Sequence, residues 1–434
     1  MRTYLVAFLV SFGVAAGLTP VLCAIASSIG GMDRAGSSRK VHREPMPRIG
    51  GIAIVCGFFA PLVGLFLWEN TVSAMFLNEP ARALGLFAGG LGIAALGLCD
   101  DLRGVSARTK LLVQVSIASL MFALNYRVAA IGNPFDGGVI DLGLWSFPLT
   151  VFWIVGIINA VNLIDGLDGL AAGVAVIVVA LTFAMAVGQG DVLMCLLMAA
   201  LGGAIIGFLF YNASPAAIFM GDTGSMFLGF VLATAAVATS RKSSTAVALF
   251  VPIVALGLPI ADTLLAIVRR TLQGRPVFAA DREHIHHRLL SKGFDPWQTV
   301  LVLYAVCLGL AVFAFILTFM SQPVAAVSLA ALGAVAGLGL RRLGYLDVTP
   351  HGIHLLLSGR GQTRALYRAV HSSLGALQAV SRADDIMVGL APFGLAVGAD
   401  MLTLSVLPPR GSHDGGSAWS WSRLAISPGT AVAK

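Results

Sequence analysis

The chain has 434 residues, of which 57% are apolar and only 11% are charged, and its formal net charge is +7. A soluble domain carries about 25% charged residues, so this composition excludes an ordinary soluble protein and predicts an all-α polytopic membrane protein. The positive charge does not indicate nucleic-acid binding, because basic residues gather in the cytoplasmic loops of membrane proteins. We therefore expect a membrane and an anionic substrate as partners, and no nucleic acid.

Eleven apolar stretches follow one another along the chain. A spanning helix needs roughly 17 to 25 residues, and the stretches match or approach this length. They run from Tyr4 to Ala26, Gly50 to Trp68, Leu84 to Leu98, Leu111 to Leu124, Phe147 to Leu163, Leu170 to Val187, Val192 to Tyr211, Met226 to Thr239, Ala246 to Val268, Val300 to Met320 and Val324 to Leu340. We expect about eleven transmembrane helices, the eighth of which could begin nearer Ile218.

The basic residues of the loops set the orientation of these helices. The loops after the first, third and ninth stretches carry fourteen Lys and Arg residues, whereas the loops on the other side carry only Arg82, Arg127, Arg241 and Lys242. Because basic loops stay on the cytoplasmic side, the N-terminus is expected outside and the chain after Leu340 inside. All the clusters of acidic residues and histidines described below then fall on the cytoplasmic side.

Two adjacent carboxylates, Asp100 and Asp101, follow the third stretch. Their mutual repulsion raises the pKa of one of them unless a cation lies beside them. A Mg²⁺ ion or a proton would relieve this repulsion, and an aspartate with a raised pKa is a usable general base. The alternative is a solvated pair at the membrane interface, neutralised by Arg103 and Arg108.

A run of polar residues, Asn159, Asn162, Asp165 and Asp168, has a spacing of three that would place them on one side of a helix. Two Asp-Gly steps should break that helix and expose backbone amides to a nucleotide or phosphate. A turn capped by aspartates is the alternative, but it does not explain two amide side chains within the preceding apolar stretch.

A carboxylate among small residues, Gly221-Asp222-Thr223-Gly224, precedes the eighth stretch, and Phe219 beside it could stack on a flat base. Small residues let oxygen ligands crowd a cation, although the same residues are also typical of a helix N-cap. Asp262, within the ninth stretch, is either a structural partner of Arg269 or a residue of the site.

Imidazoles and cations are concentrated in the loop before the tenth stretch, where Arg282 precedes His284, His286 and His287. Such side chains bind phosphate or transfer protons near neutral pH. The spacing is not that of a His-Glu-x-x-His zinc protease. A solvated basic loop is the alternative interpretation.

In these motifs the chain resembles the polyprenyl-phosphate N-acetylhexosamine-1-phosphate transferase family over residues 1 to 340. The motifs occur in the family's order and include Arg39-Lys40-Val41-His42, Arg48-Ile49-Gly50-Gly51 and Met220 to Ser225. The form His284-Ile285-His286-His287-Arg288-Leu289 resembles the branch that uses N-acetylglucosamine 1-phosphate. It is less similar to the phospho-MurNAc-pentapeptide branch, whose pattern has three adjacent histidines.

The resemblance implies a bacterial inner-membrane enzyme that transfers an N-acetylhexosamine 1-phosphate, most simply GlcNAc 1-phosphate, from its UDP-sugar to polyprenyl (undecaprenyl) phosphate. The reaction releases UMP at the cytoplasmic face, requires Mg²⁺ with Mn²⁺ as the alternative ion, and primes cell-envelope polysaccharides. The resemblance is also compatible with a homodimer. Which UDP-HexNAc is used does not follow from the motifs.

The resemblance also implies roles for individual residues. Asp222 would bind the metal, Asp100 would be the base for the lipid phosphate, and Asp101 would assist or bind metal. The uridine site would comprise Asp165, Gly166, Leu167, Asp168 and Phe219. The pyrophosphate and the sugar would be held by Lys40, His42, Arg43, Lys110, Asn159, Asn162, Arg282, His284, His286 and His287.

Phosphoryl transfer between two anions needs neutralising cations and precise alignment. We expect a single displacement by the lipid phosphate, with a covalent aspartyl intermediate as the alternative. A cation-coupled transporter of an anionic solute is the runner-up from another class, although a transporter should place its site at the membrane midplane. A non-catalytic scaffold would not explain acidic and histidine clusters on one side.

The chain divides into a membrane catalytic domain, residues 1 to 340, and a cytoplasmic extension, residues 341 to 434. In the extension, Gln362 to Val380 has the pattern of an amphipathic helix, and Ile386 to Leu390 and Met401 to Val406 have that of strands. We expect a small α+β module that ends in a disordered Gly/Ser/Pro-rich segment.

Overall fold

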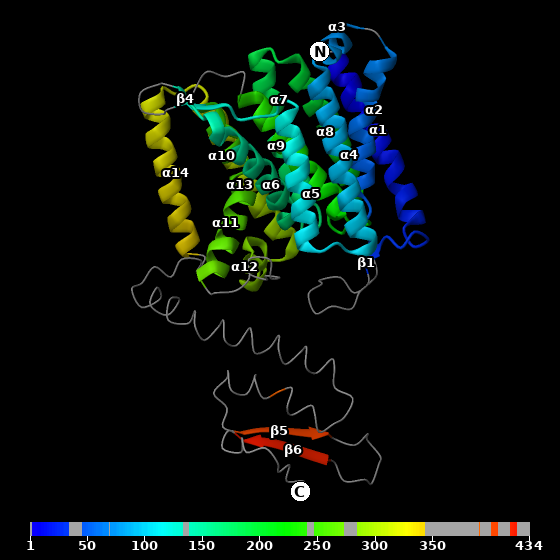
Figure 1. Cartoon of the computed structure of the whole chain (residues 1–434), viewed down its shortest axis with the longest axis vertical. Helices are drawn as coiled ribbons and strands as arrows, with labels where there is room; N and C mark the ends of the chain where they lie inside the picture. The colour runs from blue at the N-terminus through cyan, green and yellow to red at the C-terminus, as the bar shows by residue number, and fades with distance from the viewer. Residues whose placement is uncertain are drawn as a thin grey trace. The chain divides into compact units, whose positions relative to one another are not determined.

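The structure is a computed structural model that describes residues 2–33, 46–68, 70–132, 139–240, 247–272, 284–342, 390, 401–406 and 417–422. Most of the described part is helical (Figure 1). The longer helices are α1 (Arg2–Ile25), α2 (Gly51–Leu67), α4 (Pro80–Arg103), α5 (Ala107–Ala123), α6 (Ser146–Ile164), α7 (Leu170–Gln189), α8 (Val192–Asn212), α9 (Gly221–Ser240), α11 (Gly257–Leu272), α13 (Pro296–Leu317) and α14 (Gln322–Arg342).

Shorter elements connect these helices. They are the helices α3 (Thr71–Leu77), α10 (Val247–Ala255) and α12 (Ile285–Ser291), the 3₁₀ turn η1 (Gly143–Trp145) and two small antiparallel pairs, β1 (Met32–Asp33) with β2 (Met46–Pro47) and β3 (Ala130–Gly132) with β4 (Val139–Asp141).

All eleven expected apolar stretches are helical, with one correction. The ninth is not one helix but two, α10 and α11, which are separate on either side of Leu256. Within the described ranges, eight helices are long and apolar enough to cross a membrane, or nine if α2 and α3 form one bent span. The protein is therefore a multi-pass membrane protein, and the count of eleven spans stays a prediction.

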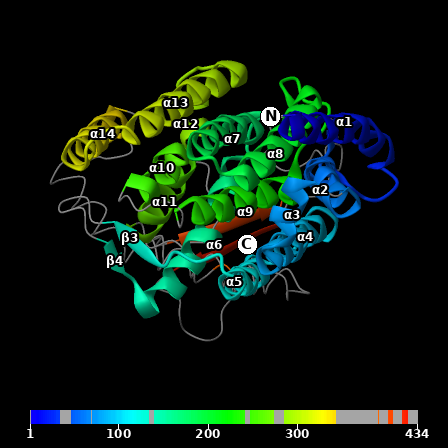
Figure 2. The same ribbon diagram turned by 90° about the horizontal axis from the view of Figure 1, so that it is seen from above.

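Helix α9 occupies the middle of the bundle, and α4 and α6 pack on it from two sides (Figure 2). Glycines allow this close approach: a methyl group added to Gly97 of α4 would lie 2.5 Å from Cα of Thr223, and one added to Gly229 would lie 2.6 Å from Cα of Ile158. Phe227 and Phe230 of α9 are fully buried. This packing fixes the start of α9 against the ends of its neighbours.

The Asp-Gly steps end a helix as predicted. Helix α6 stops at Ile164 and α7 starts at Leu170, and Gly169 between them has a φ of 73°, which is unfavourable for residues other than glycine. Only Asn159 and Asn162 of the polar run therefore lie on α6, whereas Asp165 and Asp168 belong to the turn.

The C-terminal part contributes an antiparallel hairpin of β5 (Met401–Val406) and β6 (Ser417–Ser422). The first strand is the one predicted from the sequence. The second corrects the expectation of disorder for Ser417–Ser422, which pair with β5 along six residues. The other elements predicted in the extension lie outside the described residues, apart from Leu390.

Candidate active site at the ends of α4, α6 and α9

A lysine joins two carboxylates from different helices. Nζ of Lys110, at the start of α5, donates hydrogen bonds to Oδ2 of Asp100 at 2.7 Å and to Oδ2 of Asp222 at 2.5 Å. Asp100 lies in the last turn of α4 and Asp222 in the first turn of α9. Since 112 residues separate Lys110 from Asp222, only the helix packing brings them together.

Asn162 completes this group from the end of α6. Its amide nitrogen lies 3.1 Å from Oδ1 of Asp222 and 2.9 Å from Oγ of Ser225, and that hydroxyl in turn donates to the carbonyl of Gly221. The other Asp100 oxygen accepts from the backbone amide of Val105 at 2.6 Å. We name Asp100, Lys110, Asn162 and Asp222 the carboxylate cluster.

Asp101 has a different environment from its neighbour Asp100. It is only 3% exposed, and its two oxygens accept hydrogen bonds from the amides of Asp222 and Thr223, each at 2.9 Å, and from the Thr223 hydroxyl at 2.6 Å. These are the unpaired amides at the start of α9. The geometry makes Asp101 the anchor of α9, and its role as an assistant base or a metal ligand stays a prediction.

Arg48 stabilises the same junction and was not among the predicted site residues. Its guanidinium donates to the carbonyls of Asp100, at 2.9 Å, and of Asp101, at 2.7 Å from Nε. These carbonyls lie in the last turn of α4, where that of Asp100 also accepts from the amide of Gly104 at 2.9 Å, so Arg48 adds donors to a helix end that has few of its own. The Arg-Ile-Gly-Gly motif was a signal for this residue, but the motif alone does not reveal a backbone partner.

The turn from Asp165 to Gly169 borders the cluster. Asp168 accepts a hydrogen bond from the amide of Ala216 at 3.1 Å, and the carbonyl of Gly169 accepts one from the Tyr304 hydroxyl at 2.6 Å. Desolvation, together with the negative charges of Asp222, Asp101 and Asp168, raises the pKa of Asp165 to about 8. The raised pKa favours the protonated form of Asp165, in which the carboxyl group can donate a hydrogen bond.

The histidines reach this turn from α12. A methyl group added to Gly166 would lie 2.6 Å from Nε2 of His286, so the ring packs directly on the turn. Burial, followed by the charge of His287, lowers the pKa of His286 to about 4. The lowered pKa favours the neutral ring, and the role of His286 in phosphate binding or proton transfer stays a prediction.

The remaining predicted residues divide into three groups. The amide nitrogen of Asn159 donates inside the bundle to Oε1 of Gln114 at 2.7 Å and to the carbonyl of Val155 at 2.8 Å. Phe219 is half-buried, and its backbone carbonyl accepts from the amide of Gly50, while Leu167 forms part of the turn. The last group, Lys40, His42, Arg43 and Arg282, lies outside the described residues.

Asp262 was an open question between two roles. The structure pairs it with His284, whose Nδ1 lies 2.9 Å from Oδ2 of Asp262, and thereby links α11 to the histidines. Among the residues described, no three His, Cys, Asp or Glu side chains come together as a ready-made metal site.

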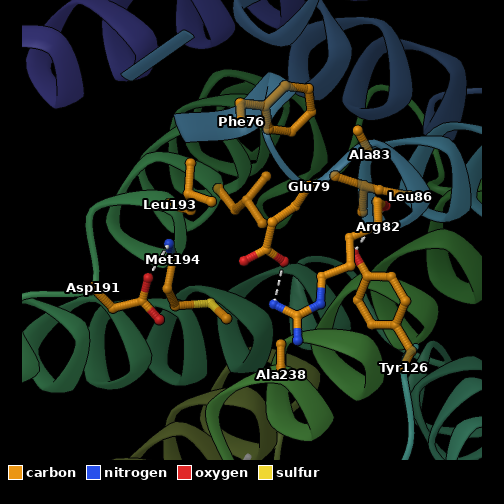
Figure 3. Close-up of a pocket in the computed structure, with 11 residues that line it drawn as sticks. Phe76, Glu79, Arg82, Ala83, Leu86, Tyr126, Asp191, Leu193, Met194 and Ala238 are labelled. Carbon is orange, nitrogen blue, oxygen red and sulfur yellow. Dashed lines mark hydrogen bonds and ion pairs between the residues drawn. The ribbon is translucent and has the colours of Figure 1, made fainter. Parts of the chain in front are cut away.

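The pocket drawn in Figure 3 lies at the opposite ends of α4, α8 and α9 and contains none of the predicted site residues. Its charged groups already have partners: Arg82 pairs with Glu79 at 2.5 Å, and Asp191 accepts from the amide of Met194 at the start of α8. Fold and carboxylate cluster thus define the class, a multi-pass membrane protein with ionised side chains gathered at the ends of its helices, which is typical of a functional site.

Comparisons with known proteins identify the family within this class. Residues 83–240 match the family Glycosyl transferase family 4. The chain is 40% identical over 306 residues to a probable undecaprenyl-phosphate N-acetylglucosaminyl 1-phosphate transferase of Bacillus subtilis (strain 168), covering 70% of this chain and 82% of that relative. It is 35% identical over 306 residues to a decaprenyl-phosphate N-acetylglucosaminephosphotransferase of Mycolicibacterium smegmatis, covering 66% and 75%.

A third relative represents the other branch. A phospho-N-acetylmuramoyl-pentapeptide-transferase of Thermoanaerobacter sp. (strain X514) is 34% identical over 284 residues, which cover 62% of this chain and 82% of that protein. The chain belongs to the polyprenyl-phosphate N-acetylhexosamine-1-phosphate transferases of glycosyl transferase family 4. The family membership expected from the motifs is confirmed.

Proposed function

We propose that the protein transfers N-acetylglucosamine 1-phosphate from UDP-GlcNAc to a polyprenyl phosphate at the cytoplasmic face of a bacterial inner membrane. The names of the relatives with 40% and 35% identity support this sugar and a polyprenyl phosphate acceptor. The observation that carries the proposal is the bridge from Lys110 to Asp100 and Asp222, because a site for two anionic phosphates needs cations held in place.

The carboxylate cluster also suits Mg²⁺. Two carboxylate oxygens already converge on one cationic group, the ammonium of Lys110, and Mg²⁺ is usually held by one or two carboxylates together with substrate phosphates. Asp222 would hold the ion, with Asp100 beside it. When bound, the ion would neutralise charge on the reacting phosphates.

The residues of the chain would then align two phosphates. A lipid phosphate oxygen forms a bond to the phosphorus that carries the sugar, and the bond from that phosphorus to the bridging oxygen breaks, so that UMP leaves. The lipid phosphate is already an anion, because the second pKa of a phosphate monoester is about 6. The dianion attacks without giving up a proton. Asp100 would accept the proton only from the minor, monoanionic form, and Lys110 would offset the charge of the transferred group.

The turn next to the cluster would bind the nucleotide. Protonated Asp165 can donate to a uracil carbonyl, and Phe219 lies at the start of the segment leading into α9, where it could stack on the base. The neutral ring of His286 against Gly166 would close the site towards the pyrophosphate. A site at the helix ends, rather than at the membrane midplane, also disfavours the transporter alternative.

The test uses purified protein, undecaprenyl phosphate, Mg²⁺ and a panel of UDP-GlcNAc, UDP-GalNAc and UDP-MurNAc-pentapeptide, with UMP and lipid-linked product as readouts. We expect product from UDP-GlcNAc, loss on chelation with EDTA and recovery with Mg²⁺. The Asp222→Asn variant should lose at least about 100-fold in kcat, since one metal-binding charge contributes several kcal/mol.

Asp191→Asn is the matched control, because asparagine also caps helices and Asp191 lies at the far end of the bundle, in the pocket of Figure 3. It should retain wild-type turnover. Product formed only from UDP-MurNAc-pentapeptide would place the protein in the phospho-MurNAc-pentapeptide transferase branch instead. Solute uptake into vesicles without any UMP would contradict the transferase proposal.

A further inference from the structure

A buried carboxylate outside the carboxylate cluster holds the histidines. Asp262, in α11, is 3% exposed, and both of its oxygens have partners: Oδ2 lies 2.9 Å from Nδ1 of His284, and Oδ1 accepts from the backbone amide of Ile285 at 2.9 Å. His284 is 5% exposed. A buried carboxylate is costly unless it is fully hydrogen-bonded, and here each bond is made to the segment that carries the histidines.

The hydrogen bond sets the position of the proton on the His284 ring. The carboxylate oxygens of Asp262 accept hydrogen bonds, and Oδ1 already accepts from Ile285, so we assign the proton that faces Oδ2 to Nδ1 of His284. Nε2 is then the atom that remains for other partners. This arrangement, in which one ring nitrogen is held by a carboxylate so that the other is presented, fixes the tautomer and the orientation of an imidazole.

The fixed ring continues into the candidate active site. The rings of His284 and His286 are parallel within 4°, with centroids 5.9 Å apart, and the ring centroids of His286 and His287 are 4.3 Å apart. His286 is 2% exposed and packs on Gly166. An unbroken series of contacts therefore leads from Asp262 through His284 and His286 to the Asp165–Gly169 turn.

We propose that Asp262 is a positioning residue, which fixes the tautomer of His284 and the start of α12 and thereby orients His286 against the turn that borders the carboxylate cluster. The inference rests on the proposed function for its kinetic consequence only. Asp262 does not touch the reacting atoms in this scheme and acts through His284.

Asp262→Asn tests this with almost no change in volume. The asparagine oxygen can still accept from Ile285, but its amide group would donate towards Nδ1 of His284 and move the ring proton to Nε2. We expect kcat for UMP release to fall about 10- to 100-fold, as for other carboxylates that orient a functional histidine. The dissociation constant for UDP-GlcNAc should change less than about threefold, because the nucleotide contacts remain.

The second variant is His284→Asn, whose amide nitrogen reproduces Nδ1 as a donor to Asp262 but offers nothing in place of Nε2. It should fold normally and lose kcat to the same extent. The kcat of the double variant should be no more than about twofold below that of the more impaired single variant. The reason is that both substitutions interrupt the same Asp262–His284 contact. Thr263→Val, an isosteric change at the next residue of α11, is the control and should keep the wild-type kcat.

The direct readout is the ¹⁵N spectrum of labelled histidine in the full-length protein, with the His284 signals assigned by their loss in His284→Asn. Wild type should show Nδ1 protonated, and Asp262→Asn should show the proton on Nε2. An unchanged tautomer, or losses that multiply in the double variant, would overturn the proposal. If wild type releases no UMP from any UDP-sugar, the proposed function fails, whereas the tautomer result, which needs no substrate, still decides the role of Asp262.

Discussion

Adjacent residues of the same type have different roles in this site. Asp100 faces Lys110 and the carboxylate cluster, whereas Asp101 turns to the amides at the start of α9. Successive residues on a helix point about 100° apart, so two neighbouring side chains meet different surroundings. The two adjacent aspartates therefore have different partners, a lysine side chain for Asp100 and backbone amides for Asp101.

His286 should make stability depend on pH. Its pKa is about 4 in the folded protein and about 6.5 when unfolded. The unfolded state therefore binds more protons between these values. Stability contributed by the neutral ring is fully present above pH 6.5 and declines as the pH falls to about 4, with a slope on the order of 1 kcal/mol per pH unit.

Thermal unfolding of the detergent-solubilised protein from pH 7 to pH 4 measures this. His286→Gln, which cannot titrate, should lose less stability on acidification than wild type. Equal acid sensitivity of the two proteins would show that His286 does not contribute to it.

At the scale of the elements, the site depends on how closely α4 and α9 approach each other. Gly97 lies where the backbone of Thr223 leaves no room for a side chain, and Asp101 one turn later binds the amides of the same residues. The distance that lets Asp100 and Asp222 share Lys110 is set by this contact.

Gly97→Ala should therefore force the two helices apart. We expect a loss of about 1–3 kcal/mol in the free energy of unfolding, as for other overpacked cores, and lower turnover. Gly156→Ala in α6 is the matched control, because nothing lies within 4 Å of the added methyl group; it should be neutral or stabilise by up to about 1 kcal/mol. Thermal unfolding in detergent and UMP release measure both variants, and equal losses in the two would contradict this account.

At the scale of the whole molecule, the site residues gather at one end of the helix bundle. Asp100 ends one helix and Asp222 begins another, so their common location follows from the up-and-down course of the chain. The prediction that this end is cytoplasmic rests on the basic residues of the loops.

Cysteine labelling tests that orientation in a variant without the five native cysteines. Leu144→Cys, at a position that is 95% exposed beside the β3–β4 hairpin, should react with a membrane-impermeant maleimide in intact cells. Ser106→Cys, in the exposed loop between α4 and α5, should react only after lysis. The reverse pattern would place the carboxylate cluster outside.

Several features could be read from the sequence because they are local properties of the chain. The length of an apolar run determines whether a helix can cross a bilayer, and all eleven predicted stretches are helical. The Asp-Gly steps predicted the break between α6 and α7, since glycine adopts conformations that end a helix. The motifs in their order were also sufficient to indicate the family.

The tertiary structure alone decided the partner of each polar side chain. Lys110 and Asp222 are 112 residues apart, and Asp262 and His284 are 22 residues apart, so neither pairing has a local signal. Hydrogen bonds require atoms within about 3 Å, and such distances depend on the packing of whole helices. For this reason the sequence determined that this is a membrane transferase with clusters of polar residues, and the fold determined that Asp100 pairs with Lys110, Asp101 anchors α9 and Asp262 pairs with His284.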